Sequence, residues 1–123
     1  FNVEYLDLNR LFAKADIITI HLNLNSGTRG LINKLLLSKM KKSAIIVNTS
    51  RGEVINEEDL SLVLNQNLIK GACLDVFANE PYYGSLSKQT NVISTPHIGS
   101  YAKEIRNRME LESVNNLIEF FYE

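Results

Sequence analysis

Four short runs of the chain are rich in apolar residues without a strict alternation of apolar and polar positions, and segments with helical patterning separate them. The runs are IITIHL (17–22), AIIVN (44–48), GACLDV (71–76) and NVIST (91–95). A strand with one solvated face alternates apolar and polar residues, whereas a strand of a parallel sheet covered by helices on both faces does not. The pattern therefore predicts an α/β fold built on a doubly wound parallel sheet.

Helix-capping residues stand at the start of the segments around these runs. Asp, Asn and Ser side chains at an N-cap accept hydrogen bonds from the free backbone amides of the first turn. The predicted helices are 8–15 after Asp7, 34–40 after Asn33, 57–67 after Asn56, and a final helix after Ser100. Strands and helices thus alternate along the chain, as helical crossovers between parallel strands require.

The bulk composition is that of an ordinary globular domain. The 123 residues are 45% apolar and 22% charged, with a formal net charge of -1, and this length suffices for one domain with a core. No basic surplus points to nucleic acid or to an anionic membrane, and no apolar run is long enough to span a bilayer. Cys73 is the single cysteine, so no internal disulfide forms, and a reducing, cytoplasmic setting is expected.

Polar residues gather at the ends of the predicted strands. Parallel strands place their carboxyl ends on one edge of the sheet, where ligands of such folds bind. The residues at or after these ends are His21, then Asn48, Thr49, Ser50 and Arg51, then Asp75 with Glu80 in the loop that follows, and finally His97. Each of them alone also fits an ordinary turn or strand-end role. As a set on one edge, they predict a ligand site.

The residue types in this set suit chemistry on a 2-hydroxy or 2-oxo acid. Arg51 can bind a carboxylate through a two-pronged hydrogen bond. His97 can exchange a proton near neutral pH, and Glu80 can orient the imidazole ring through its other nitrogen. Asp75 and the backbone around Asn48 can hold a polar ligand. Oxidation of the alcohol also needs a hydride acceptor, which no side chain provides, so a nicotinamide cofactor is expected. No metal-ligand spacing and no G-x-S-x-G motif occur.

With these residues in view, the sequence resembles the D-isomer-specific 2-hydroxyacid dehydrogenases. The segments that carry the resemblance are ADIITIHLNL, GTRGLINKLLLSKMKKSAIIVNTSRGEVINEEDL, GACLDVFANEP and NVISTPHIGS. They follow the family's order and spacing over almost the whole chain. The tail PHIGSYAKEIRNRMELESVNNL looks most like the phosphoglycerate dehydrogenase branch. The resemblance implies a Rossmann-like nucleotide-binding fold.

The resemblance also implies roles for individual residues. Arg51 matches the arginine that binds the substrate, His97 the acid/base histidine and Glu80 the glutamate paired with it. The residues that match NAD-contacting positions, with Arg51 and His97 beside them, are His21, Thr28, Asn48, Thr49, Ser50, Asp75 and Gly99. The implied substrate is a D-2-hydroxy acid, with 3-phosphoglycerate as one candidate, and the implied parent enzyme is a homodimer.

Two departures from the family pattern bear on these roles. Asn23 stands where the family usually has proline, which affects the adenosine side. The chain also contains no G-x-G turn for a pyrophosphate and no following acidic residue for the ribose, so NADP is not excluded. We interpret residues 1–99 as the C-terminal part of an NAD-binding domain and residues 100–123 as a helix that returns toward an absent substrate domain.

Two alternatives to a catalytic role stay open on the sequence. The first is an NAD-sensing, non-catalytic binding protein on the same fold, like the family's corepressor relatives. The second is an inactive truncated fragment. Whether the chain comes from a binding protein, is an inactive fragment or belongs to an active enzyme, the isolated 123 residues are expected to be inactive.

Overall fold

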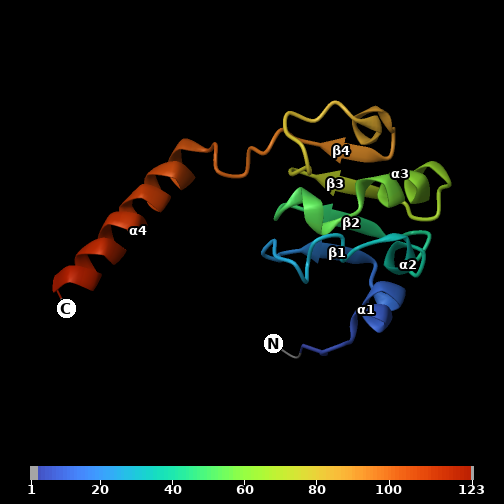
Figure 1. The fold of residues 1–123 in the computed structure, drawn as a ribbon, viewed down its shortest axis with the longest axis horizontal. Helices are drawn as coiled ribbons and strands as arrows, with labels where there is room; N and C mark the ends of the chain where they lie inside the picture. Colours follow the sequence, from blue (N-terminus) through green and yellow to red (C-terminus); the bar gives the residue numbers. More distant parts are fainter. Residues whose placement is uncertain (1–2, 123) are drawn as a thin grey trace.

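The computed structural model describes residues 3–122 and shows a four-stranded parallel sheet (Figure 1). The strands are β1 (Ile17–Ile20), β2 (Ile45–Asn48), β3 (Gly71–Leu74) and β4 (Val92–Ser94). They lie side by side in chain order, and every neighbouring pair is parallel. The predicted parallel α/β sheet is confirmed.

Helices connect and precede the strands. They are α1 (Leu8–Lys14), α2 (Lys34–Leu37), α3 (Glu57–Asn65) and α4 (Lys103–Tyr122), with short 3-10 helices η1 (Gly52–Val54) and η2 (Ser85–Lys88). The predicted caps Asp7, Asn33 and Asn56 are confirmed, since each side chain accepts hydrogen bonds from backbone amides of its helix's first turn. No pattern in the sequence predicts η1 or η2.

Helices cover one face of the sheet in the described part of the chain, not both. Because strand order follows chain order without a reversal, right-handed crossovers place α2, α3 and η2 on the same side. On that side Ile18, Ile46 and Ala72 join the helices in one core. On the opposite side Ile17 and Ile93 are 66% and 68% exposed. A second helix layer requires the reversal of strand order that doubly wound sheets contain, and β1 to β4 contain none.

Two helices end earlier than the sequence predicts. α2 ends at Leu37 rather than Met40, because the amides of Lys39 and Met40 bond to carbonyls three residues back and tighten the chain into turns. α3 ends at Asn65, because Asn67 adopts a left-handed conformation with φ 52°, which stops a right-handed helix.

The last helix begins later than predicted. Its first residue is Lys103, and the Arg106 amide bonds to the carbonyl of Ala102, so Ser100 lies too early to cap it. α4 projects away from the sheet (Figure 1), and none of its described residues is buried. No helix within residues 3–122 combines the length and the apolar character needed to cross a membrane.

The strands stop at or just before the polar residues of interest. β1 ends at Ile20 and β3 at Leu74, so His21 and Asp75 directly follow their strands. Asn48 is the last residue of β2, and Thr95 follows β4. The carboxyl edge of the sheet therefore presents these residues together, as predicted from the parallel topology.

Candidate active site

Asn48 organises the turn that carries Arg51. The residue is 1% exposed. Its Oδ1 accepts hydrogen bonds from the amide and the hydroxyl of Ser50, at 3.1 and 3.0 Å, and its Nδ2 donates to the Arg51 carbonyl at 3.0 Å. Every polar atom of the Asn48 side chain is thus engaged within the turn. Asn48 therefore supports the site by fixing the backbone of the Arg51 turn. A direct contact between its side chain and a cofactor stays a prediction.

The Arg51 guanidinium remains available to a ligand. The side chain is exposed and donates one hydrogen bond, from Nη1 to the Ser50 carbonyl at 2.6 Å. No carboxylate within residues 3–122 forms a salt bridge with it. The guanidinium has five N–H donors, so most of its capacity for a carboxylate remains.

Gly52 brings this turn into contact with the loop that carries Glu80. A Cβ atom at Gly52 would lie 2.0 Å from the carbonyl carbon of Phe77 and 2.3 Å from the nitrogen of Ala78. No side chain fits at such distances. The backbone after Arg51 therefore packs directly on the Phe77–Ala78 peptide.

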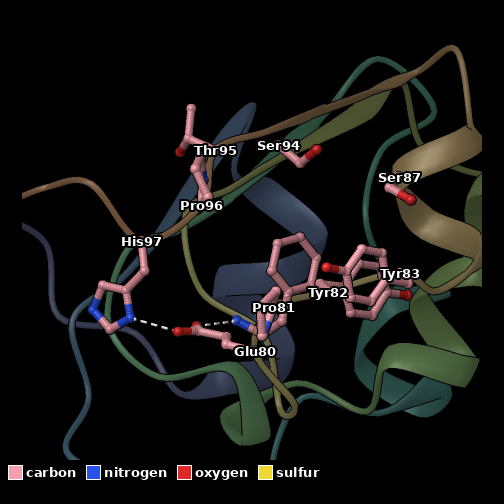
Figure 2. Close-up of a pocket in the computed structure, with 10 residues that line it drawn as sticks. Glu80, Pro81, Tyr82, Tyr83, Ser87, Ser94, Thr95, Pro96 and His97 are labelled. Atoms are coloured by element: carbon pink, nitrogen blue, oxygen red, sulfur yellow. Dashed lines mark hydrogen bonds and ion pairs between the residues drawn. The ribbon is translucent and has the colours of Figure 1, made fainter.

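Glu80 and His97 form a hydrogen-bonded pair (Figure 2). His97 Nδ1 lies 2.8 Å from Glu80 Oε2, and the Phe77 amide donates to Glu80 Oε1 at 2.9 Å. The side chains of His97 and Glu80 are 49% and 36% exposed. The predicted proximity of this pair is thus present in the structure, while its catalytic role is a proposal.

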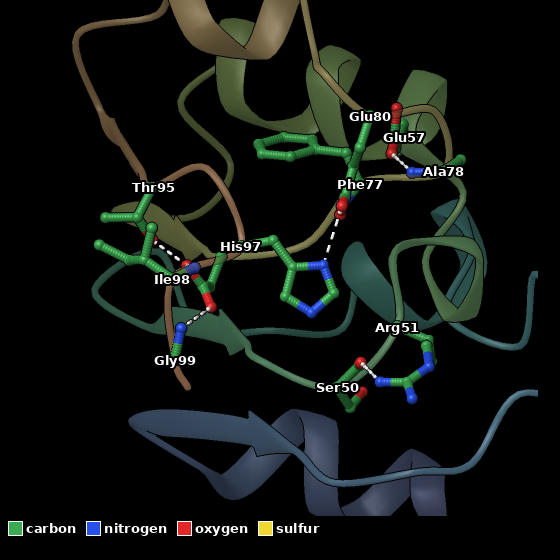
Figure 3. Close-up of polar contacts among 11 residues, drawn as sticks. Ser50, Arg51, Glu57, Phe77, Ala78, Glu80, Thr95, His97, Ile98 and Gly99 are labelled. Atoms are coloured by element: carbon green, nitrogen blue, oxygen red, sulfur yellow. Dashed lines mark hydrogen bonds and ion pairs between the residues drawn. The ribbon is translucent and has the colours of Figure 1, made fainter. Parts of the chain in front are cut away.

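Electrostatics fix the direction of the bond between Glu80 and His97. The hydrogen bond from the Phe77 amide is the largest influence on the pKa of Glu80 and lowers it. Burial raises this pKa, and the hydrogen bond and charge of His97 lower it. The pKa of Glu80 therefore lies below the ordinary glutamate value. Glu80 is therefore charged near neutral pH and can only accept, which places a hydrogen on Nδ1 of His97. Nε2, on the side of the ring toward Ser50 and Arg51 (Figure 3), is the nitrogen that can exchange a proton with a ligand.

Asp75 shapes the turn around His97. His97 has a φ of 55°, a left-handed conformation that non-glycine residues rarely adopt. The Asp75 carboxylate accepts hydrogen bonds from the Thr95 hydroxyl and from the amides of Ile98 and Gly99, the last two at 3.0 and 3.1 Å. Both oxygens are engaged by the chain itself. The contact with a nicotinamide that the sequence predicts for Asp75 and Gly99 stays a prediction.

The pKa of Asp75 follows from the same contacts. Burial raises it, but the Thr95 hydroxyl, the two backbone amides and the charge of His97 outweigh burial, so the pKa lies below the ordinary carboxyl value. A carboxyl group whose pKa is lowered in the folded state stabilises the fold above its unfolded pKa. That stability is lost as the pH falls through the folded pKa.

We therefore expect Asp75→Asn to flatten the acid side of the stability profile. The amide keeps the shape and some acceptor capacity but cannot gain a charge, so the free energy of unfolding should fall less steeply with decreasing pH than in wild type. Urea unfolding at a series of acidic pH values measures this slope. Glu58→Gln, a change at an exposed carboxylate of α3, is the control and should leave the slope unchanged. Equal slopes for wild type and Asp75→Asn would contradict the prediction.

Two cavities meet at Arg51. One, of about 220 Å³, has Arg51, Glu80 and His97 in its wall. The other, of about 440 Å³, lies at the ends of β1 and β2 and is lined by His21, Leu22, Asn23, Leu24, Ser50 and Arg51. The crevice predicted at the carboxyl edge of the sheet thus runs from His21 through Arg51 to His97.

A third cavity, of about 520 Å³, lies on the other side of the Glu80–His97 pair (Figure 2). The rings of Phe77 and Tyr82 stack in its wall with centroids 4.0 Å apart. Because Nε2 of His97 points away from these rings (Figure 2), we do not assign this cavity to the reacting groups.

The remaining predicted residues are His21 after β1, Thr28 in the loop that follows, and Thr49 after β2. The ring of His21 is within hydrogen-bonding distance of the Thr19 hydroxyl, at 2.9 Å. Thr28 donates to the Asn23 carbonyl at 2.6 Å and so closes the loop that forms the wall after β1. Thr49 is exposed in the Arg51 turn. Contacts of these residues with a cofactor stay predictions.

Some residues that hold the backbone of the site in place are not among those predicted from the sequence. Gly52, Thr95 and Glu57 each support a loop of the site, and Glu57 does so by accepting from the Ala78 amide at 2.6 Å. The glycine directly after Arg51 was the one available signal. Within the described residues 3–122, no group of three or more His, Cys, Asp or Glu side chains is placed to hold a metal ion.

Comparison with known proteins agrees with this arrangement. A family profile described as the NAD binding domain of D-isomer specific 2-hydroxyacid dehydrogenases matches residues 1–99. Glyoxylate reductase of Thermofilum pendens is 44% identical over 119 residues, which are 95% of this chain and 35% of that protein. Hydroxypyruvate reductase of Blautia hydrogenotrophica is 42% identical over 121 residues, 97% of this chain and 38% of that protein. The chain thus spans little more than a third of these relatives.

Solved structures share the fold. An acyclic imino acid reductase in complex with NADPH and D-Arg superposes with a TM-score of 0.87 at 34% identity, over 94% of this chain and 38% of that one. A D-isomer specific 2-hydroxyacid dehydrogenase from Lactobacillus delbrueckii ssp. bulgaricus in its NAD complexed form gives 0.80 at 31% identity, over 94% and 40%.

The phosphoglycerate dehydrogenase branch, which the tail suggested, is a more distant likeness. A putative D-3-phosphoglycerate dehydrogenase from Ralstonia solanacearum has a TM-score of 0.76 at 33% identity, over 89% of this chain and 35% of that one. The predicted family and Rossmann-like fold are confirmed. The chain belongs to the D-isomer-specific 2-hydroxyacid dehydrogenases, with residues 1–99 matching their NAD-binding domain.

Proposed function

We propose that the chain is the C-terminal part of the NAD-binding domain of a longer dehydrogenase that interconverts a small D-2-hydroxy acid and its 2-oxo acid. One observation carries this proposal: Arg51 and His97 share the wall of one cavity, and Glu80 holds the far nitrogen of the His97 ring. A cation for the substrate's carboxylate thus lies beside a group that can exchange a proton.

Each of the three residues has a distinct role in this proposal. Arg51 binds the carboxylate with its planar guanidinium and sets the orientation of the substrate. His97 donates a proton from Nε2 to the substrate oxygen in reduction and takes it back in oxidation. Glu80 holds the ring by Nδ1 and stabilises the charged imidazole. Binding and proton transfer are therefore assigned to residues of this chain.

The cavity between His21 and Arg51 fits part of a nicotinamide dinucleotide. It lies outside the carboxyl ends of β1 and β2, the position at which such sheets bind nucleotides, and it adjoins the Arg51–His97 cavity. NAD or NADP, when bound, supplies the hydride donor and acceptor. The residues proposed to hold it are those predicted from the sequence, from His21 to Gly99. The 123 residues contain no G-x-G turn for the pyrophosphate, so tight binding requires further protein.

Glyoxylate and hydroxypyruvate are the proposed substrates, ahead of 3-phosphoglycerate. The support comes from the curated relatives at 40–44% identity, which are named glyoxylate or hydroxypyruvate reductases. We further propose that residues 100–123 return toward a substrate domain, and that the parent enzyme is a cytoplasmic homodimer.

The test is an NADH- and NADPH-dependent assay with glyoxylate and hydroxypyruvate. It uses the full-length protein that contains these residues, or a chimera in which they replace the matching segment of the Thermofilum pendens enzyme. We expect turnover from either, and none from the 123-residue chain alone. Cofactor binding without turnover would favour the NAD-sensing alternative, and absence of both would overturn the proposal.

A further inference from the structure

Two successive backbone amides, those of Phe77 and Ala78, bind two different glutamates, and Figure 3 shows the contact of Ala78 with Glu57. The Phe77 amide donates to Glu80 Oε1 at 2.9 Å, within the same loop. The Ala78 amide donates to Glu57 Oε1 at 2.6 Å, and Glu57 is the first residue of α3, 21 positions earlier. The loop of the Glu80–His97 pair is therefore tied to a separate element of the fold.

The same peptide is held from a second direction. Gly52 approaches it so closely that a Cβ would lie 2.0 Å from the Phe77 carbonyl carbon. Gly52 follows Arg51 directly, and Glu57 lies in the helix just after η1. The segment from Gly52 to Glu57 thus contacts the Phe77–Ala78 peptide at both of its ends. This contact links the position of the Arg51 turn to that of the Glu80 loop.

The dipole of α3 does not by itself explain why Glu57 binds the Ala78 amide. Three acidic residues, Glu57, Glu58 and Asp59, occupy its first turn, where negative charge is favourable. Asp59 accepts from the Lys34 amide at 2.9 Å, and Glu58 is exposed. Of the three, Glu57 is the one whose hydrogen bond reaches the loop of the site. Its neighbours share the charge but not this contact, which makes a matched comparison available.

We propose that Glu57 is a positioning residue for the Glu80–His97 pair: by binding the Ala78 amide it fixes the position of Phe77, whose own amide, in the preceding peptide group, donates to Glu80. This inference rests on the proposed function for its catalytic consequence but not for its structural content. The Phe77 amide is the largest of the influences that lower the pKa of Glu80. If Phe77 were free to shift, its amide would bond Glu80 less well, which would raise the pKa of Glu80 and loosen the orientation of the His97 ring.

The first experiment measures the pKa of Glu80 by carbon-detected NMR titration of its carboxyl group in the 123-residue chain. Glu57→Ala removes the acceptor, and Glu57→Asp keeps the charge but is one methylene shorter. Glu57→Gln keeps an acceptor oxygen at the right length, and Glu58→Ala removes a neighbouring charge only. We expect the first two variants to raise the pKa of Glu80 and the last two to leave it unchanged. If Glu57→Ala does not fold, the Glu57→Asp variant decides the test.

The second experiment measures kcat/KM against pH for the same variants in the full-length protein or the chimera. Misplacement of a reacting group by about 1 Å costs on the order of a hundredfold in rate, so we expect a loss of roughly tenfold to a hundredfold in Glu57→Ala and Glu57→Asp. Their pH profiles should shift, and Glu57→Gln should restore both rate and profile.

The two experiments separate this inference from the proposed function. An unchanged Glu80 pKa in both Glu57→Ala and Glu57→Asp would overturn the positioning role, whatever the enzyme activity. A rise in Glu58→Ala equal to that in Glu57→Ala would also overturn it, because charge alone would then explain the effect. A raised pKa in a protein that reduces neither substrate would support the positioning role and remove the proposed activity instead.

Discussion

Replacement of His97 by asparagine is expected to lower kcat of the full-length protein by roughly a hundredfold to ten-thousandfold, the usual contribution of general acid–base catalysis. Asparagine is smaller and can accept the left-handed backbone at this position, where φ is 55°, so the fold should be retained. It cannot donate a proton from Nε2. Steady-state kinetics with glyoxylate and NADH measure the loss, and an unchanged NADH dissociation constant would show that the cofactor site is intact.

The direction of the pH dependence provides a further check on His97. Reduction requires a protonated ring and oxidation a neutral one, so the rate of reduction should fall with rising pH while the rate of oxidation rises. Glu80→Gln keeps the size of the side chain but leaves the His97 ring without its charged partner, so kcat should fall by less than in His97→Asn. Added imidazole should restore part of the activity of His97→Asn. A His97→Asn enzyme with wild-type kcat would contradict the assignment.

The convergence of the site could be predicted from the sequence because one topological rule places it. Continuous apolar runs imply parallel strands, and parallel strands end on one edge. Arg51 and His97, which are 46 positions apart in the chain, line the same cavity for this reason. The rule needs the approximate ends of strands and not their exact bounds, which is why early ends of β1 and β3 did not alter the outcome.

The internal hydrogen bonds of the site could not be predicted in the same way. Asp75 and the backbone around Asn48 are predicted to hold a polar ligand, which stays a prediction. No sequence pattern indicates that the side chains of Asn48 and Asp75 bind the backbone of the turns that carry Arg51 and His97. A residue type gives the number of donors and acceptors but not their partners, which depend on distances across the fold. The fit of Gly52 against Phe77 is of the same kind, because it arises between segments that the sequence does not place in contact.

Sequence patterns also do not show which segments cover each face of the sheet. Ile17 and Ile93 have the apolar character of buried strand residues, but they are exposed in the described part of the chain. An apolar run indicates that a strand is suited to burial on both faces, not which protein segment covers each face. The face of the sheet on which the crossover helices lie follows only from the strand order, which shows no reversal.

Replacement of Arg51 by lysine is expected to lower kcat/KM for the 2-oxo acid by roughly tenfold to a hundredfold or more, since each hydrogen bond to a charged group contributes about 1.5–3 kcal/mol. Lysine keeps the positive charge but not the planar pair of donors that a carboxylate accepts. The Asn48 side chain binds the backbone carbonyl of residue 51, so the turn should be retained in the variant. Most of the change should appear in KM for the acid, with a smaller change in KM for NADH.

Arg29→Lys is the matched control for this substitution. Arg29 is an exposed arginine with a single salt bridge, to Glu53 at 3.6 Å, and the two exchanges are chemically the same. Surface pairs of this kind contribute little, so Arg29→Lys should keep wild-type kinetics. The decisive comparison is the ratio of the KM values for glyoxylate in the two variants. If Arg51→Lys and Arg29→Lys gave the same KM as wild type, Arg51 would be a turn residue and the carboxylate would have to bind elsewhere. A rise confined to Arg51→Lys would place the substrate carboxylate at the Arg51 guanidinium, in the wall of the cavity that also contains His97.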